Sequence, residues 1–212
     1  MKHEELLAKY ARSRQDIAAR LLHFKQVGKK GGRVLFEELC FCLLTPQSKA
    51  RSCDAAIQEL KERKLMFGGD AAAIAKVLST KTRFHNNKSK YLVEAREKYC
   101  EGKFALLEKA TFEGTEKDAR DHFLKNVKGL GLKEASHYLR NVGRGSALAI
   151  LDRHILKNLV KYGAIPRVPA SLTEKRYLEI ERAMEKFCKQ TGVPLAHLDL
   201  LFWAEETGEI FK

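Results

Sequence analysis

Apolar and polar residues along this chain follow the spacing of helices rather than strands. The segment EKRYLEIERAMEKF, which follows Thr173, places its apolar residues at helical intervals. Alternation of apolar and polar positions, the mark of a half-buried strand, is absent. The run VLFEELCFCLL at 34–44 is too apolar for a surface helix and predicts a helix that runs through a core. The predicted fold class is therefore all-α.

Helix starts and breaks divide the pattern into segments. Residues that favour helix N-termini precede several apolar segments, namely Asp70, Asn86 or Asn87, Thr115 and Thr173. Stretches containing glycine or proline separate the segments, at 28–33, 45–48, 68–69 and 143–146 and around Pro166 and Pro169. No internal repeat or long linker is visible, so the helices are predicted to be joined by short connections.

The charge balance favours a polyanionic partner. Of 212 residues, 44% are hydrophobic and 32% are charged, which is enough for one sizeable core or two small ones. Lysine and arginine exceed aspartate and glutamate by 40 − 27 = 13, an excess that favours nucleic acid over a general effect on solubility. Residues 81–98 carry six basic and two acidic side chains, and residues 117–140 carry six and three. Folded segments, rather than a basic tail, are expected to carry the positive surface.

Several protein classes are disfavoured by what the sequence lacks. No apolar run approaches the roughly 18 residues of a membrane helix, and the start MKHEELLAKY has no apolar signal region. We therefore expect an intracellular protein, and a monomer, because no extended apolar stripe calls for a partner. The cysteines are odd in number and form no Cys-x-x-Cys pair, which argues against disulfides or a zinc site: Cys40, Cys42, Cys53, Cys100 and Cys188.

A Gly-x-Gly turn is the first candidate for binding chemistry. Gly129 and Gly131 lie between a predicted helix that ends at Val127 and another that begins around Leu132. Two glycines one residue apart permit unusual backbone angles and expose N–H groups at a helix N-terminus, where a phosphate can bind. Such a clamp would position DNA without reading its sequence. The alternative is an ordinary helical hairpin.

Lys133 and Asp152 are the candidate catalytic residues. Lys133 lies in the first turn of the second helix, where the helix dipole and partial burial both favour a neutral, nucleophilic amine. Asp152 follows 19 residues later, after ALAIL, at the predicted start of another helix. A capping carboxylate is held rigidly, so capping and chemistry are compatible. The alternatives are a solvated surface lysine and a simple helix cap.

The segments that contain these residues resemble the helix-hairpin-helix DNA glycosylase superfamily: they are KGLGLKEASHYLRNVG and ILDRHI. The motif of that superfamily is a Gly-x-Gly-x-Lys hairpin followed by a loop with an aspartate. Two further segments match in the same order. LCFCLLTPQSKARS resembles the endonuclease III segment with a Leu-Leu-Ser-x-Gln core, and RFHNNKSKYL resembles its apolar-Tyr-Asn-x-Lys-Ala segment. The resemblance covers about residues 34–160. It implies that Gln47 probes DNA from the minor groove and that Phe84 fills the gap left by an extruded base.

The resemblance also implies a mechanism and its requirements. Lys133 attacks C1′ of the flipped nucleotide to form a Schiff base, and β-elimination then cleaves the strand. Asp152 stabilises the oxocarbenium-like sugar and accepts the proton of Lys133. No redox or organic cofactor is implied. Superfamily members often hold a structural cation on hairpin carbonyls, which here would be those of Lys125, Val127 and Leu130.

The C-terminal region narrows the subgroup. Endonuclease III carries four clustered cysteines for an iron–sulfur cluster, whereas only Cys188 is present here, so no such cluster is expected. The ending LLFWAEETGEIFK resembles the compact archaeal-type 8-oxoguanine DNA glycosylases, which share a Trp-x-x-x-Thr-Gly-x-x-x-Lys pattern. The pattern falls here on Trp203, Thr207, Gly208 and Lys212. The resemblance implies base recognition by Trp203 and Lys212; the alternatives are a core aromatic residue and a frayed end.

Two α-helical domains with the active site in the cleft between them are the implied architecture. One is a helical barrel of 29–145 that contains the hairpin, and the other combines 1–28 with 146–212. The implied function is a base excision repair glycosylase and AP lyase acting on double-stranded DNA that contains oxidised guanine. The alternatives are an endonuclease III-like glycosylase for oxidised pyrimidines and a non-catalytic helix-hairpin-helix DNA-binding protein. The missing cysteines and the ending disfavour the first; Lys133 with Asp152 disfavours the second.

Overall fold

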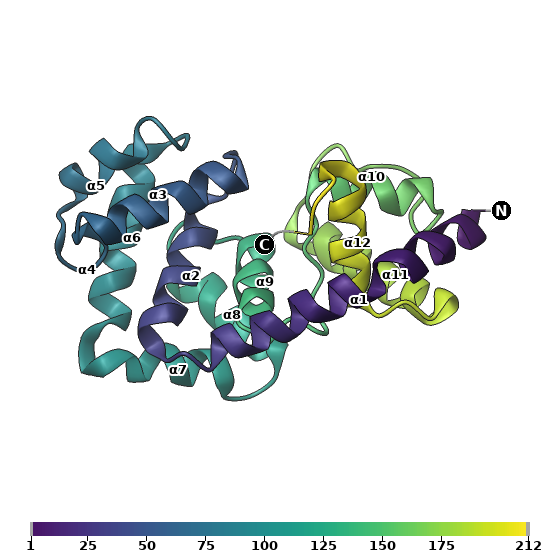
Figure 1. Ribbon diagram of the computed structural model, residues 1–212, viewed down its shortest axis with the longest axis horizontal. Helices are drawn as coiled ribbons and strands as arrows, with labels where there is room; N and C mark the ends of the chain where they lie inside the picture. The colour runs from purple at the N-terminus through teal and green to yellow at the C-terminus, as the bar shows by residue number, and fades with distance from the viewer. Residues whose placement is uncertain (1, 211–212) are drawn as a thin grey trace.

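A computed structural model describes residues 2–210, and every regular element in that range is a helix (Figure 1). The elements are, in chain order, α1 (Lys2–Gly28), α2 (Gly32–Leu44), α3 (Ala50–Glu62), α4 (Leu65–Gly68), α5 (Ala71–Leu78), α6 (His85–Tyr99), the 3₁₀ helix η1 (Glu101–Phe104), α7 (Ala105–Phe112), α8 (Glu116–Asn126), α9 (Leu132–Asn141), α10 (Arg153–Lys161), α11 (Glu174–Thr191) and α12 (Leu195–Thr207). The all-α prediction is confirmed.

Three of the four predicted helix starts are where the sequence placed them. Asp70 accepts a hydrogen bond from the Ala73 N–H at 2.7 Å and caps α5. Thr115 caps α8 through a reciprocal capping box with Asp118. Thr173 caps α11. The apolar run 34–44 lies within α2, and most of that helix is buried, as predicted.

The predicted start at Asn86 or Asn87 is wrong. Helix α6 begins at His85, and its N-cap is Phe84, whose φ of 55° lies in the left-handed region. The Phe84 carbonyl accepts the first helical bonds, from the N–H groups of Asn87 and Lys88. The Lys88 ammonium is anchored to the loop after α2. This tertiary contact outweighs the local preference of asparagine for a cap position.

Two clusters of buried apolar side chains form the cores. The first is built around α2 and draws on the helices from α3 to α9. The second combines α10, α11 and α12 with Leu6, Ile17 and Phe24 of α1. Helix α1 runs along both lobes in Figure 1, and α9 lies between them. The domain limits at 28–29 and 145–146 remain a prediction.

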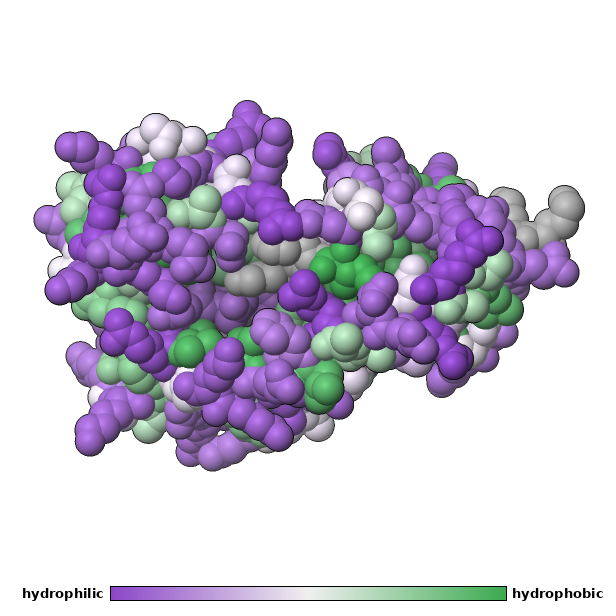
Figure 2. All heavy atoms as spheres, viewed as in Figure 1, coloured by the Kyte–Doolittle hydropathy of each residue, from purple (hydrophilic) through white to green (hydrophobic). Residues whose placement is uncertain are grey.

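Polar side chains dominate the face shown in Figure 2, and a hollow opens at its upper edge between the two lobes. Among residues 2–210, every helix is too short or too polar to traverse a bilayer.

Candidate active site

The hairpin has the form that the glycine spacing predicted. Helix α8 ends at Asn126 and α9 begins at Leu132. Gly129 has a φ of 89°, in the region that glycine favours. A Cβ at this position would lie 2.4 Å from Cδ2 of Tyr91. Both the backbone angle and the close approach of Tyr91 therefore require glycine at 129.

Gly131 is the N-cap of α9, and its N–H has a partner within the same helix. It donates to Oε2 of Glu134 at 3.2 Å, while Oε1 of Glu134 lies 3.0 Å from Nζ of Lys133. Glu134 thus bridges the hairpin backbone and the candidate nucleophile. A phosphate on the Gly131 N–H would have to displace this carboxylate. Sequence reasoning missed Glu134, although a glutamate at the third position of a helix is a common capping signal.

Lys133 lies on α9, which contributes side chains to both buried clusters. Its side chain is 26% exposed, and the preceding Leu132 packs into the second cluster. Burial lowers the pKa of Lys88, and the charge of Lys133 acts in the same direction. Burial raises the pKa of Cys53 to about 11 against the charges of Lys88 and Lys133. Lys133 therefore lies within electrostatic range of α3 and α6.

Asp152 caps α10, as predicted. Its Oδ1 accepts hydrogen bonds from the N–H groups of His154 and Ile155, both at 2.8 Å. Leu151 and Ile155, on either side of Asp152, pack in the same cluster as Leu132. The segments that carry Lys133 and Asp152 therefore meet at one core. Lys133 pairs with Glu134, and among the described residues it forms no ion pair with Asp152.

Gln47 and Phe84 are both exposed, and both have left-handed backbone conformations, with φ of 53° and 55°. Phe84 is 55% exposed and so is not part of a core. Burial would have supported a packing role for Phe84, whereas exposure fits a residue that enters DNA.

One buried lysine joins the two segments that carry these residues. Lys88 is 4% exposed, and its ammonium donates to the carbonyls of Leu44 and Pro46 and to the Ser48 hydroxyl, at 2.7, 2.8 and 2.9 Å. The Ser48 hydroxyl also accepts from the Arg83 N–H at 3.0 Å. The loop of Gln47 is thereby attached to the start of α6, beside Phe84. Sequence reasoning did not single out Lys88.

Trp203 lies beside the first turn of α10. Its ring is 5.5 Å from that of His154, edge to face at 87°. The indole N–H is buried and has no hydrogen-bond partner among residues 2–210. A buried donor of this kind is suited to an acceptor that arrives with a ligand. Lys212, the other residue predicted to recognise the base, lies outside the described residues.

The segment after α12 is attached to two other helices. Gly208 ends α12 with a φ of 77°. The Glu209 carboxylate forms a bidentate ion pair with Arg51 of α3, and the Ile210 carbonyl accepts from the Arg20 guanidinium at 3.1 Å. Since α3 packs in the first cluster and Ile210 against the second, this segment bridges the two lobes.

Burial raises the pKa of Cys40 well above its usual value, which disfavours a thiolate there.

Among residues 2–210, no group of three or more histidine, cysteine or acidic side chains is arranged to hold a metal ion. The Val127 carbonyl accepts from the Leu130 N–H at 3.2 Å and retains a second lone pair. This arrangement is compatible with the backbone cation proposed on Lys125, Val127 and Leu130, which remains a prediction.

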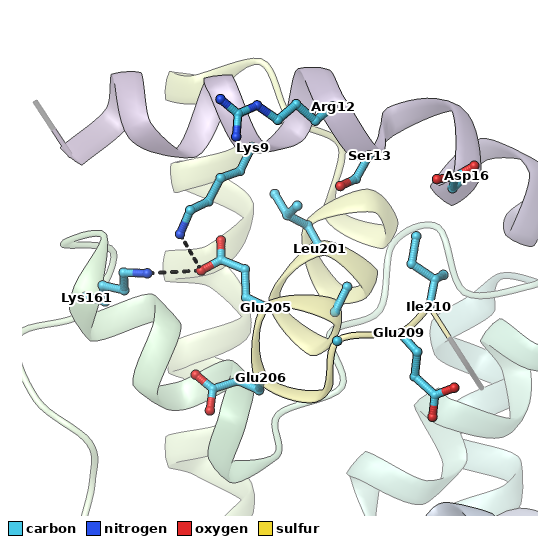
Figure 3. A pocket seen from close by; sticks show the side chains of 12 residues that line it. Lys9, Arg12, Ser13, Asp16, Lys161, Leu201, Glu205, Glu206, Glu209 and Ile210 are labelled. Carbon is cyan, nitrogen blue, oxygen red and sulfur yellow. Dashed lines mark hydrogen bonds and ion pairs between the residues drawn. The ribbon is translucent and has the colours of Figure 1, made fainter.

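A separate polar cavity of about 760 Å³ lies between α1, the end of α10 and α12 (Figure 3). Within it the Glu205 carboxylate accepts from the ammonium groups of Lys9 and Lys161, each at 3.0 Å. Lys133 and Asp152 do not line this cavity. Another lining residue, Glu206, contacts His154 Nδ1 at 3.2 Å and so connects this cavity to the first turn of α10.

The Gly-x-Gly hairpin joins two helices, a lysine lies two residues after it, and an aspartate caps the next helix. These features define a helix-hairpin-helix protein. A family model described as 8-oxoguanine DNA glycosylase matches residues 17–193. The chain belongs to the helix-hairpin-helix 8-oxoguanine DNA glycosylase family, as the sequence predicted.

Relatives and solved structures agree with this assignment. The chain is 46% identical to an 8-oxoguanine DNA glycosylase/AP lyase of Fusobacterium nucleatum, over 91% of this chain and 89% of the relative. It is 34% identical to the protein of the same description from Methanocaldococcus jannaschii, over 100% of this chain and 98% of the relative. The crystal structure of the Thermotoga maritima 8-oxoguanine DNA glycosylase superposes with a TM-score of 0.86 at 29% identity, covering 99% and 98% of the two chains. The Methanocaldococcus jannaschii enzyme in complex with a 15mer DNA containing 8-oxoguanine superposes with a TM-score of 0.85 at 32% identity, covering 98% and 100%.

Proposed function

We propose that this protein removes 8-oxoguanine from double-stranded DNA and then cleaves the strand at the resulting site, as a glycosylase and AP lyase of base excision repair. The observation that carries the proposal is Lys133, two residues after a Gly-x-Gly hairpin in a chain of the 8-oxoguanine glycosylase family. The names of the relatives and the DNA complex of a structural neighbour support the same activity.

Lys133 is proposed as the nucleophile. The neutral amine attacks C1′, and the bond from C1′ to the base breaks, with its electron pair leaving on the base as the base takes up a proton. Loss of the amine proton and opening of the sugar ring give the Schiff base. Removal of a proton from C2′ then expels the 3′ phosphate by β-elimination. Because Glu134 pairs with the resting ammonium, Lys133 has to leave this contact before it reacts.

Asp152 is proposed to stabilise the positive charge that develops on the sugar as the base leaves. Its Oδ1 is held by two backbone N–H groups of α10. Those bonds fix the position of the carboxylate. The same carboxylate is the proposed acceptor of the Lys133 proton.

Duplex binding is proposed to use the exposed residues around the cleft. The target base has to leave the stack before it can be excised. Phe84 and Gln47 are the proposed residues that occupy the vacated space, and the exposed conformation of each supports this role. Trp203 and Lys212 are the proposed base contacts. The buried indole N–H of Trp203 supports its part. We further propose that the protein acts inside the cell as a monomer and needs no cofactor beyond a structural cation at the hairpin.

Borohydride trapping tests the proposal. Lys133→Gln should abolish both the trapped protein–DNA adduct and strand cleavage, while duplex affinity stays close to that of the wild type. Lys128→Gln is a matched control, since it makes the same change at an exposed lysine of the same hairpin. Wild-type trapping by Lys133→Gln would assign the nucleophile to another residue, and no trapping by the wild type would favour a non-catalytic DNA-binding protein.

Two further assays separate the remaining alternatives. Asp152→Asn retains a residue that caps helices well but loses the charge, so single-turnover excision should fall by orders of magnitude. A rate within a few-fold of wild type would leave Asp152 as a helix cap. Excision from thymine glycol duplexes, measured beside 8-oxoguanine duplexes, distinguishes an endonuclease III-like specificity, and we expect 8-oxoguanine to be preferred.

A further inference from the structure

The segment that leads to Asp152 is buried without being helical. Residues 148–151 have no regular secondary structure, and all four are at most 7% exposed. A buried segment of this kind needs partners for its backbone N–H and C=O groups, since unpaired ones are costly. Nothing in a local helix or strand holds it. Its local backbone bond joins the Asp152 N–H to the Ile150 carbonyl at 3.0 Å, and the groups of Ala149 and Leu151 depend on side chains from elsewhere.

Two side chains of α11 supply those partners. The Tyr177 hydroxyl donates to the Ala149 carbonyl at 2.6 Å and accepts from the Leu151 N–H at 3.3 Å. Glu181 accepts from the Ala149 N–H at 2.8 Å. Tyr177 and Glu181 are four residues apart and so lie on one face of α11. Together they hold both backbone groups of Ala149 and the N–H of Leu151, directly before Asp152.

Glu181 also connects this segment to the hairpin. It forms a bidentate pair with Arg120 of α8, at 2.6 and 3.0 Å, and both residues are 2% exposed. The same guanidinium lies 3.4 Å from the Ser136 hydroxyl, three residues after Lys133 on α9. Hydrogen bonds therefore run from the helix of Lys133 through Arg120 and Glu181 to the segment of Asp152.

We propose that Tyr177 and Glu181 are positioning residues that hold the Asp152 carboxylate in register with Lys133. The inference rests on the proposed function of those two residues. A buried ion pair alone is weak evidence for stability, because apolar residues of similar size often serve as well. Here the pair and the tyrosine hydroxyl also fix the backbone that carries a reacting group. A displacement of about 1 Å in such a group costs on the order of 100-fold in rate.

Tyr177→Phe is the sharpest test, because it removes one hydroxyl and keeps the buried ring. Single-turnover excision of 8-oxoguanine should fall by about 10- to 100-fold, with duplex affinity unchanged. Tyr162→Phe is the matched control. It makes the same change at a tyrosine of the same buried cluster, whose hydroxyl bonds instead to Glu205. Thermal melts fix a temperature at which all variants are folded, and the rates are compared there.

A second measurement separates positioning from general weakening of the structure. If Tyr177 acts through Asp152, adding Tyr177→Phe to Asp152→Asn should lower the rate no further, because residues that act as a unit are not additive. The inference would be overturned if the rate losses of Tyr177→Phe and Asp152→Asn were fully additive in the double variant, or if Tyr177→Phe alone left the rate unchanged. In either case, wild-type excision and trapping would leave the proposed function standing, whereas inactive wild-type protein would remove the proposed function itself.

Discussion

Arg140 and Asp199 form a buried ion pair that joins the helix of Lys133 to the helix of Trp203. Nη1 of Arg140 lies 2.7 Å from Oδ2 of Asp199, and the two residues are 6% and 4% exposed. Arg140 is near the end of α9, and Asp199 lies one turn before Trp203 on α12. The pair therefore connects α9, which carries the candidate nucleophile, to α12, which carries the proposed base-recognition residue, through one buried contact.

This pair should make stability depend on pH. Burial raises the pKa of Asp199 to about 6, with Arg140 acting in the opposite direction and Asp152 raising it further. The stability from a raised carboxyl pKa is present below the unfolded value near 4 and is lost as pH rises through the folded value. Relative to Asp199→Asn, the wild type should therefore lose roughly 2 kcal/mol of unfolding free energy between pH 4 and pH 7. Urea unfolding of both proteins across that range checks this.

Asp121→Asn is the control for that measurement, since Asp121 is an exposed aspartate on α8. The unfolding free energies of this control variant and of the wild type should differ by an amount that changes little with pH. If the unfolding free energies of the wild type and Asp199→Asn differ by a constant amount, Asp199 keeps its charge from pH 4 to pH 7.

Lys88 should be needed for the loop that presents Gln47. Lys88→Met removes the ammonium that bridges the Leu44 and Pro46 carbonyls and the Ser48 hydroxyl, and hydrogen bonds to a charged group contribute about 1.5–3 kcal/mol. We expect a lower unfolding free energy and a clear loss of affinity for damaged duplex. Lys90→Met is the control at an exposed position of the same helix. Equal affinities for the two variants would show that the anchor does not set the loop.

Phe84 should contribute to DNA binding and not to stability. Its side chain is 55% exposed, and its left-handed backbone, with φ of 55°, is strained for a residue other than glycine. Phe84→Gly should therefore be more stable than Phe84→Ala, by about 1 kcal/mol. Both should bind damaged duplex more weakly, with a smaller change on damaged single strands. Equal losses on both substrates would contradict the wedge role.

Removal of Lys212 should affect base recognition more than folding. The preceding segment stays attached through Glu209 to Arg51 and through Ile210 to Arg20, and last residues seldom carry core contacts. If Lys212 binds the base, loss of a charged hydrogen bond costs on the order of 1.5–3 kcal/mol. This corresponds to roughly a 10- to 150-fold loss of discrimination between 8-oxoguanine and guanine. Excision rates and thermal melting of residues 1–211 test it; an unchanged rate would leave Trp203 as the proposed contact.

Local signals in the sequence determined the helices and the hairpin. Apolar spacing and capping residues act over one or two turns, so Asp70, Thr115 and Thr173 predicted their helix starts correctly. The Gly-x-Gly spacing predicted the turn between α8 and α9 in the same way. Motif order along the chain was sufficient for the family, because those motifs are contiguous in sequence.

Only the tertiary structure decided how those parts meet. Lys88 reaches a carbonyl 44 residues earlier in the chain, and Glu181 reaches Arg120 across 61 residues. Neither contact has a local signal, because a lysine or a glutamate on a helix is ordinarily a solvated residue. The start of α6 moved to His85 for the same reason. Packing of the two lobes brought these groups together and excluded water, so that their positions became fixed by hydrogen bonds that no short segment could make alone.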